Sequence, residues 1–289
     1  MKKPTGTGER SAIDSSHPVV LVTGGTSGIG LATARLLAQR GFTVVAVGRH
    51  TDGLEAAGPD GASAQGSLTF RHMDVTVSDQ IADVISALPR LDAVVHCAGF
   101  GIAGSAERTP IEAVRRQFEV NYFGVLRVNG LALPLMRRTA ARTHRPGHVV
   151  VVGSIAGRIG IPFQSHYSST KAALEVYVEA LRLEGRRHGV TATIVEPGDL
   201  ATGFTKAREV DEPADSPYAA ELRRSVGQME HDELSGAGPE TVATVVAHVI
   251  ASPRPPVRVA VGASYKALMQ LKRVMPDRLV EAIMRRLYM

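Results

Sequence analysis

Two kinds of segment alternate along this chain: short runs of apolar, mostly β-branched residues, and longer segments with an apolar residue at every third or fourth position. The short runs are apolar on both faces, which is typical of strands buried inside a parallel sheet. They predict strands at 19–23, 43–47, 68–73, 92–96, 148–153, 191–196 and 257–261. The helical spacing predicts helices at 30–40, 78–88, 111–138, 165–187 and 239–251. This alternation indicates the α/β class, with a doubly wound parallel sheet covered by helices on both faces.

The two ends of the chain depart from this alternation. Residues 1–17 are polar, and no apolar segment follows Lys2 and Lys3, so we expect a flexible tail and no secretory signal. Residues 18–262 are expected to form a single α/β domain, followed by a helical extension over 263–289. The most apolar stretch, 124–136, contains Arg127 and Asn129 and is too short to span a membrane.

Charge is distributed unevenly along the chain. The 289 residues carry a net charge of +5, but 252–289 holds eight basic and two acidic residues, so the remainder is close to neutral. A nucleic-acid partner would have to bind that segment, which lacks interleaved aromatic and basic residues, and we therefore expect none. The one cysteine, Cys97, excludes a disulfide within the chain and favours the cytoplasm.

A glycine-rich segment joins the first predicted strand to the first predicted helix. It reads Thr-Gly-Gly-Thr-Ser-Gly-Ile-Gly over 23–30. Glycines there allow a tight turn and let the backbone approach a pyrophosphate, which rests on the helix N-terminus. An ordinary glycine-rich turn is the alternative, but the position between strand and helix favours the dinucleotide site of a Rossmann fold. The candidate cofactor residues in this segment are Gly24, Thr26, Ser27, Gly28, Ile29 and Gly30.

A second group of candidate residues follows the valine-rich strand at 148–153. Tyr167 and Lys171 are four residues apart in a predicted helix, so both side chains project from one face. Ser154 directly follows the strand, thirteen residues before Tyr167. Taken one by one, these residues could equally be a helix cap and an amphipathic pair. Together with the glycine-rich segment, whose pattern is TGxxxGxG, they resemble the short-chain dehydrogenase/reductase family, in its single-domain branch.

The resemblance implies an oxidoreductase with Asn121, Ser154, Tyr167 and Lys171 as its catalytic set. Tyr167 would exchange a proton with the substrate oxygen, and we expect the Lys171 ammonium to lower the Tyr167 pKa from its usual value of about 10. Ser154 would stabilise charge on that oxygen. Lys171 would also hold the nicotinamide ribose, and Asn121 would hold a water that relays protons to Lys171. The alternative is a catalytically idle family member that binds the dinucleotide as a sensor or scaffold.

The end of the second strand bears on the choice of nucleotide. An NAD site usually places an acidic residue there to bind the ribose 2′-hydroxyl. This chain has Gly48 followed by Arg49, and a guanidinium would bind a 2′-phosphate. We therefore expect NADP(H), with Arg49 and the Thr26 hydroxyl at the 2′-phosphate, although Arg49 could also be a solvated surface charge. Besides Tyr167 and Lys171, the family pattern implies further cofactor contacts from Asp74, Val75, Ala98, Gly99, Pro197, Gly198 and Thr202.

One segment departs from the family pattern. Where the family has Asn-Asn-Ala-Gly after its fourth strand, this chain has His96, Cys97, Ala98 and Gly99. We expect His96 to be structural rather than a catalytic base, Cys97 to be a small buried hydrophobe, and no metal site.

The substrate side of the site is predicted to be mostly apolar. The segment 203–238, with two prolines and a cluster of acidic residues, resembles the mobile substrate lid of the family, or else is a plain surface insertion. The expected pocket residues are Phe100, Ile102, Ile155, Ile161, Phe163, Leu200 and Phe204. They predict a lipophilic ketone or secondary alcohol, as in members that act on retinoids or steroids, which the sequence after Val257 also resembles. The resemblance further implies a homodimer or homotetramer, assembled through 111–138 and 165–187.

The basic C-terminal segment has the pattern of an amphipathic helix, with Pro276 as its expected first residue. One face of this helix would carry five apolar side chains: Leu279, Val280, Ile283, Met284 and Leu287. Three basic side chains would lie largely off that face: Arg278, Arg285 and Arg286. Such a helix could bind a membrane surface, but we favour packing on its own domain or on a partner subunit.

Overall fold

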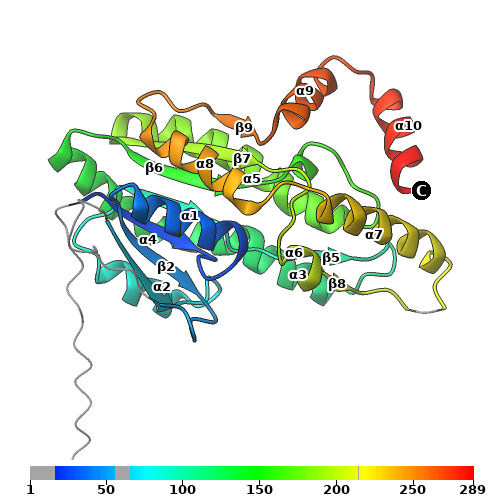
Figure 1. Cartoon of the computed structure of the whole chain (residues 1–289), viewed down its shortest axis with the longest axis horizontal. Helices are drawn as coiled ribbons and strands as arrows, with labels where there is room; N and C mark the ends of the chain where they lie inside the picture. The colour runs from blue at the N-terminus through cyan, green and yellow to red at the C-terminus, as the bar shows by residue number, and fades with distance from the viewer. Residues whose placement is uncertain (1–16, 56–65, 214) are drawn as a thin grey trace, which may run out of the picture.

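A parallel sheet forms the centre of the molecule. The computed structural model describes residues 17–55, 66–213 and 215–289, so the predicted tail 1–17 lies outside the described residues except for His17. Seven parallel strands lie in the order β3-β2-β1-β4-β6-β7-β9 (Figure 1). They are β1 Val19–Thr23, β2 Thr43–Gly48, β3 Ser67–His72, β4 Ala93–His96, β6 Gly147–Val152, β7 Val190–Glu196 and β9 Arg258–Ala260. The predicted doubly wound fold is confirmed, and the strand ends differ from the prediction by about one residue.

Helices cover both faces of this sheet because alternate strand residues point to opposite sides. In β1, Val19 and Leu21 enter one core while Val20 and Val22 enter the other. The first core is closed by α2 Ser78–Ser86, α4 Gly124–Thr143 and α5 Ser165–Gly185. The second core is closed by α1 Gly28–Gln39 and α8 Pro239–Ala251.

The strand order creates a crevice at the carboxyl ends of β1 and β4. From β1 the chain moves outward to β2 and β3, and it then returns to β4 on the other side of β1. Loops leaving β1 and β4 therefore diverge, and ligands of such sheets bind where they separate. The glycine-rich segment 23–30 leaves β1 at this point, and 97–99 leaves β4 beside it.

The predicted helix 111–138 is divided in the structure. It comprises α3 Ile111–Phe118, a π-helical turn over Glu119–Phe123, and α4, which continues to Thr143. A π-helical turn fits one extra residue into the helix and is frequent at functional sites. Asn121 lies in this turn, and the apolar periodicity on either side gave no sign of the interruption.

The segments after β7 lie over the carboxyl ends of the strands. They contain α6 Phe204–Ala207, α7 Ala219–Leu234 and a two-residue strand, β8 Glu209–Val210, which pairs with β5 Ile102–Ala103. Strands this short leave no sequence pattern, so neither was predicted.

Two further helices end the chain. They are α9 Ala263–Lys272 and α10 Asp277–Tyr288, and α10 packs against α7 (Figure 1). Pro276 precedes α10 with ψ of 142°, so the expectation that it is the first helical residue is wrong by one position. Over the described ranges, the helices are all too short or too polar to cross a bilayer.

Candidate active site

The glycine-rich segment packs so tightly that side chains are excluded from it. Gly24 has φ of +62°, and a Cβ on it would lie 2.7 Å from the Ala98 nitrogen. A Cβ on Gly30 would lie 2.1 Å from the Gly24 carbonyl oxygen. The backbone of this turn therefore lies directly against the loop that follows β4, with the N-terminus of α1 at its end. This cradle fits a dinucleotide pyrophosphate, which backbone N–H groups and a helix N-terminus bind well.

The end of β2 is shaped by Thr26. A Cβ on Gly48 would lie 2.5 Å from the Thr26 hydroxyl oxygen, so an acidic side chain at position 48 would displace Thr26. Arg49, the next residue, is exposed. The structure thus places Thr26 directly over Gly48 at the carboxyl end of β2, and its contact with a nucleotide there, like that of Arg49, stays a prediction.

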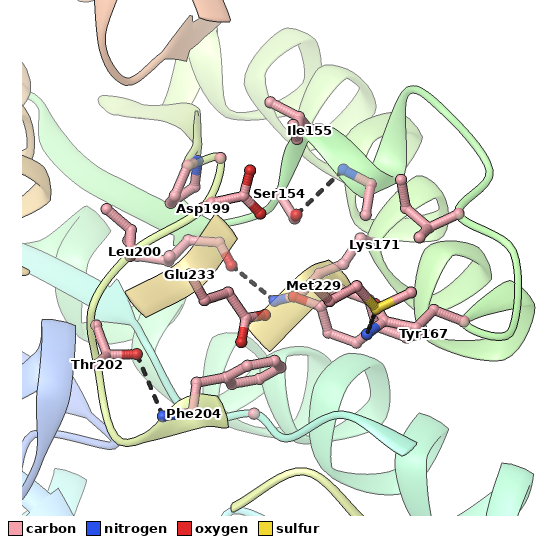
Figure 2. A pocket seen from close by; sticks show the side chains of 18 of the residues that line it. Ser154, Ile155, Tyr167, Lys171, Asp199, Leu200, Thr202, Phe204, Met229 and Glu233 are labelled. Carbon is pink, nitrogen blue, oxygen red and sulfur yellow. Dashed lines mark hydrogen bonds between the residues drawn. The ribbon is translucent and has the colours of Figure 1, made fainter. Parts of the chain in front are cut away.

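Ser154, Tyr167 and Lys171 converge on one cavity (Figure 2). Ser154 lies at the carboxyl end of β6, where its Oγ accepts a hydrogen bond of 3.1 Å from the Ala156 nitrogen. Tyr167 and Lys171 lie in the first two turns of α5 and are both buried. The Lys171 Nζ donates to the Val152 carbonyl at 3.0 Å and lies 5.7 Å from the centroid of the Tyr167 ring. The strand and helix predicted around these residues therefore bring them together.

Asn121 holds the loop after β4 against α5. Its Oδ1 accepts from the Phe100 nitrogen at 3.0 Å, and its Nδ2 donates to the Phe100 carbonyl at 3.0 Å. The Nδ2 also donates to the Thr170 hydroxyl at 3.2 Å. A Cβ on Gly99 would lie 3.1 Å from the Asn121 Oδ1. The absence of a side chain at Gly99 therefore lets the loop come close enough for Asn121 to bond the Phe100 backbone. Asn121 thereby positions the loop beside Lys171, while its water-relay role stays a prediction.

Burial dominates the protonation of Tyr167 and Lys171, two of the predicted catalytic residues. It raises the pKa of Tyr167 to about 12, with a hydrogen bond from Ser154 opposing the shift. Burial also lowers the pKa of Lys171 to about 8. The expectation that Lys171 lowers the Tyr167 pKa does not hold in this structure, because the ammonium is directed to the Val152 carbonyl and the phenol is desolvated.

The residues predicted beside the adenine form a fixed turn after β3. The Asp74 Oδ1 accepts from the nitrogen and the hydroxyl of Thr76, each at 2.8 Å. The Asp74 nitrogen donates to the Gln80 side chain at 2.7 Å. Val75 is buried against Gly124, where a Cβ would lie 2.7 Å from the Val75 Cγ2. The turn lies at the carboxyl end of β3, and its contact with adenine stays a prediction.

The loop after β7 lines the same cavity through Pro197, Gly198 and Thr202, and the Pro197 carbonyl accepts a hydrogen bond of 2.9 Å from the Ile155 nitrogen. The ring of Tyr265, from α9, lies against Gly198, where a Cβ would be 2.1 Å from it. The Tyr265 hydroxyl donates to the Asp199 carboxylate at 2.5 Å and accepts from the Asp199 nitrogen at 3.1 Å. The C-terminal extension thus holds the loop predicted to border the nicotinamide, a role that nothing in the sequence around Tyr265 indicated.

The apolar lining was predicted in part. Ile155, Ile161, Leu200 and Phe204 line the cavity. Three of the expected residues lie elsewhere: Phe100 on the loop held by Asn121, Ile102 in β5, and Phe163 against α7. The lining residues that sequence reasoning missed include one at the N-cap of α5, two in α7 and one in α10: Gln164, Met229, Glu233 and Tyr288.

Two charged side chains of the segment 203–238, Arg208 and Glu233, meet beside the cavity, whose lining was predicted to be mostly apolar. Arg208 forms an ion pair with Glu233, and the Arg208 side chain is 1% exposed. The Arg208 guanidinium lies 5.9 Å from the Phe204 ring, which in turn lies 5.7 Å from the Tyr167 ring. Figure 2 shows Glu233 directed into the cavity beside Phe204. This ion pair was not predicted, because its two residues are 25 apart in sequence and leave no local pattern.

His96 and Cys97, the departure from the family pattern, have different surroundings. The His96 Nε2 is 2.9 Å from the Asn129 Oδ1, and the Asn129 Nδ2 donates to the Tyr177 hydroxyl at 3.1 Å. Burial lowers the pKa of His96 to about 4, so the ring is neutral and connects β4 to α4 and α5. Cys97 borders the cavity, and burial raises the pKa of its thiol to about 12. This geometry favours the structural interpretation of His96.

Known proteins resemble this chain over most of its length. A family model described as short chain dehydrogenase matches residues 18–213. A 3-ketodihydrosphingosine reductase of Bacteroides thetaiotaomicron is 32% identical over 277 residues, which cover 93% of this chain and 97% of that protein. Retinol dehydrogenase 8 of Homo sapiens is 31% identical over 270 residues, which cover 88% of this chain and 85% of that protein. Among solved structures, a short-chain dehydrogenase from Streptomyces avermitilis has a TM-score of 0.73 and 28% identity, covering 90% of this chain and 95% of its own.

Proposed function

The chain belongs to the short-chain dehydrogenase family, and we propose that it is an NADP(H)-dependent oxidoreductase acting on a lipophilic ketone or secondary alcohol. The observation that carries the proposal is the convergence of Ser154, Tyr167 and Lys171 on one cavity, which Pro197 and Gly198 also line. The bound nicotinamide supplies or accepts the hydride.

The protein's own residues handle the proton. The Tyr167 hydroxyl gives a proton to the carbonyl oxygen in reduction, or takes one from the alcohol in oxidation. The Ser154 hydroxyl donates a hydrogen bond to the same oxygen and stabilises the charge that develops on it. Lys171, whose pKa is lowered to about 8, exchanges protons near neutral pH and so replenishes Tyr167. Asn121 keeps the 99–100 loop in place beside this pair.

The end of β2 supports NADP(H) over NAD(H). Thr26 occupies the space that an acidic side chain at position 48 would need. Arg49 is exposed at the same strand end, where its guanidinium would bind the 2′-phosphate together with the Thr26 hydroxyl. The remaining predicted cofactor contacts would follow the crevice from the adenine to the nicotinamide: Gly24, Ser27, Gly28, Ile29, Gly30, Asp74, Val75, Ala98, Gly99 and Thr202.

The cavity lining supports a lipophilic substrate. Ile155, Ile161, Leu200, Phe204 and Met229 present apolar surface around Tyr167. The relatives named 3-ketodihydrosphingosine reductase and retinol dehydrogenase 8 carry lipophilic compounds in their names. We therefore place long-chain or polycyclic ketones and alcohols first among candidate substrates.

The test is cofactor consumption over a panel of such ketones, with NADPH and NADH compared on each. We expect NADPH to give a kcat/KM higher by about tenfold or more, and Arg49→Ala to remove most of this preference. Arg40→Ala, at the far end of α1, serves as the matched control and should change neither cofactor. Preference for NADH would overturn the nucleotide assignment. Dinucleotide binding without turnover over the whole panel would favour the idle sensor or scaffold instead.

We also propose that the enzyme is a cytoplasmic homodimer or homotetramer. On α5, Val176 and Leu183 are 68% and 75% exposed, and such apolar side chains on a long helix suit an interface. Size-exclusion chromatography with light scattering tests this assembly. Monomeric protein at the concentration of the activity assay would contradict it.

A further inference from the structure

The C-terminal helix α10 has an inner apolar face that belongs to the active-site end of the molecule. Val280 and Met284 pack against a cluster that contains Ile159, Ala260 and Met269. Tyr288, one turn further along the same face, lines the catalytic cavity. Figure 1 shows α10 at the same end of the molecule as α7, beyond the strands. The position of α10 is therefore fixed relative to the cavity by its own side chains.

A second apolar stripe runs along α10 beside this inner face. Leu279, Ile283 and Leu287 are spaced by four residues, so they line up along the helix, and they are 49%, 41% and 55% exposed. We call these three residues the outer stripe of α10. The five apolar residues predicted to share one face are therefore divided, with two turned inward and three turned outward. Aliphatic side chains aligned in this way on a surface helix mark an interaction site.

Arginines border the outer stripe. Arg286 lies seven residues, or about two turns, beyond Leu279 and so falls on the adjoining line of the helix. Arg278 and Arg285, also seven residues apart, form the next line, and all three arginines are exposed. The acidic residues of this helix are Asp277 and Glu281, so α10 is net basic. An apolar stripe with a basic border is typical of helices that lie in the interface of an anionic bilayer.

We propose that the outer stripe of α10 and its three arginines dock onto an anionic phospholipid bilayer. The helix would lie along the surface, with the stripe in the acyl boundary and the guanidinium groups among the lipid phosphates. A second copy of the chain fits the same face poorly. In a two-fold interface the patch meets itself, which would bring six arginines together.

Docking would also place the catalytic cavity close to the lipid surface, because Tyr288 continues from α10 into that cavity. A lipophilic ketone or alcohol partitions into the bilayer and would reach Tyr167 from there. This consequence rests on the proposed function, whereas the docking itself does not.

The experiment is co-sedimentation of the full chain with vesicles of phosphatidylcholine alone, or of phosphatidylcholine with phosphatidylglycerol. We expect binding to the mixed vesicles only. Each arginine removed should weaken it by about fivefold, so that Arg285→Gln with Arg286→Gln lowers the affinity by about 25-fold. The matched control is Arg35→Gln with Arg40→Gln, two exposed arginines of α1 and its C-cap, outside the proposed subunit interface, which should bind like the wild type.

The apolar contribution has its own matched pair. Leu287 and Ile111 are both 55% exposed, on α10 and α3. Leu287→Asn should weaken sedimentation by about tenfold or more, and Ile111→Asn should leave it unchanged. Because both residues are half-exposed, neither change threatens folding.

Three outcomes would overturn the proposal. They are absence of binding to the mixed vesicles, equal sedimentation of the α10 variants and their controls, and a vesicle-free dimer that Leu287→Asn dissociates. The last would make a second copy the occupant of the face. Sedimentation needs no turnover, so failure of the proposed activity would leave this result standing, and failure of docking would leave the activity standing.

Discussion

The floor and the roof of the cavity are built on different principles. The floor consists of Ser154, Tyr167 and Lys171, which extend from β6 and α5 and are supported by the sheet. The roof consists of the segment 203–238 with α9 and α10, and long-range side-chain contacts such as Tyr265 with Asp199 help to hold it. A rigid floor suits chemistry, which needs fixed distances, and a roof held by separable contacts suits entry and release of ligands. Substitutions in the floor should therefore affect the rate, and substitutions in the roof should affect stability and binding.

The largest effect is expected from Tyr167→Phe, which removes one oxygen from the floor. Without the hydroxyl no group can exchange the proton with the substrate oxygen, so kcat should fall by about 1000-fold or more. The affinity for NADPH, measured by fluorescence titration, should stay within a few-fold of the wild type. Ser154→Ala provides a graded comparison, since it leaves the proton donor in place. Residual activity of Tyr167→Phe near the wild-type rate would remove Tyr167 from its proposed role.

The next largest effect should come from breaking the buried ion pair of the roof. Arg208→Met removes the Arg208 partner of Glu233 and should destabilise the lid by about 3 kcal/mol. The measurement is limited proteolysis with hydrogen exchange of α7, because lid opening need not shift the global unfolding transition.

A second ion pair of the same region supplies the control for Arg208→Met. Arg116 pairs with Glu209 of β8 at 2.8 Å, but the two side chains are 56% and 50% exposed. Water screens such a pair, so Arg116→Met should cost less than about 1 kcal/mol. Equal protease sensitivity of the two variants would show that burial of the Arg208 pair does not hold the roof.

The sequence was sufficient to predict the floor but not the roof. The apolar strand before Ser154 and the helix that carries Tyr167 and Lys171 leave local patterns, and the family resemblance implied that the three residues meet. Tyr265 and Asp199 are 66 residues apart, and their contact leaves no periodic signal. The π-helical turn at Asn121 was equally invisible, because the apolar spacing continues through it. Local pattern thus predicts elements and their ends, whereas contacts between distant loops depend on the folded geometry.

A buried carboxyl group on α5, the helix that carries Tyr167 and Lys171, is expected to make the stability of the protein depend on pH. Glu175, one turn beyond Lys171, has its pKa raised to about 8 by burial and by the nearby Glu196, against the opposing effect of Arg258 and Arg158. Between pH 4.5 and about 8 the folded protein therefore retains a proton that the unfolded chain releases. The folded state binds more protons over this window, so Glu175 makes stability fall as pH rises through it.

Glu175→Gln should remove that part of the pH dependence. As pH rises through this window, the free energy of unfolding of the variant should fall less than that of the wild type. Urea denaturation at a series of pH values measures it. The control is Glu184→Gln, which replaces an exposed carboxylate of the same helix. Its free energy of unfolding should change with pH as that of the wild type does. If the stability of Glu175→Gln varied with pH in the same way as that of the wild type, the Glu175 carboxyl of the wild type would be ionised over the whole window.

The smallest effect tests whether the C-terminal extension contributes to the cofactor side of the cavity. Tyr265→Phe keeps the ring against Gly198 but removes the hydroxyl that bonds both the carboxylate and the nitrogen of Asp199. Loss of these bonds should cost about 1 kcal/mol in holding the loop, and so weaken NADPH binding by about fivefold with kcat nearly unchanged. Tyr218→Phe removes a comparable bond of 2.7 Å to Glu107, away from the cavity, and should leave the affinity for NADPH unaltered. A lower kcat with unchanged affinity in Tyr265→Phe would instead assign this roof residue to the chemistry of the floor, and the division between the two would no longer hold.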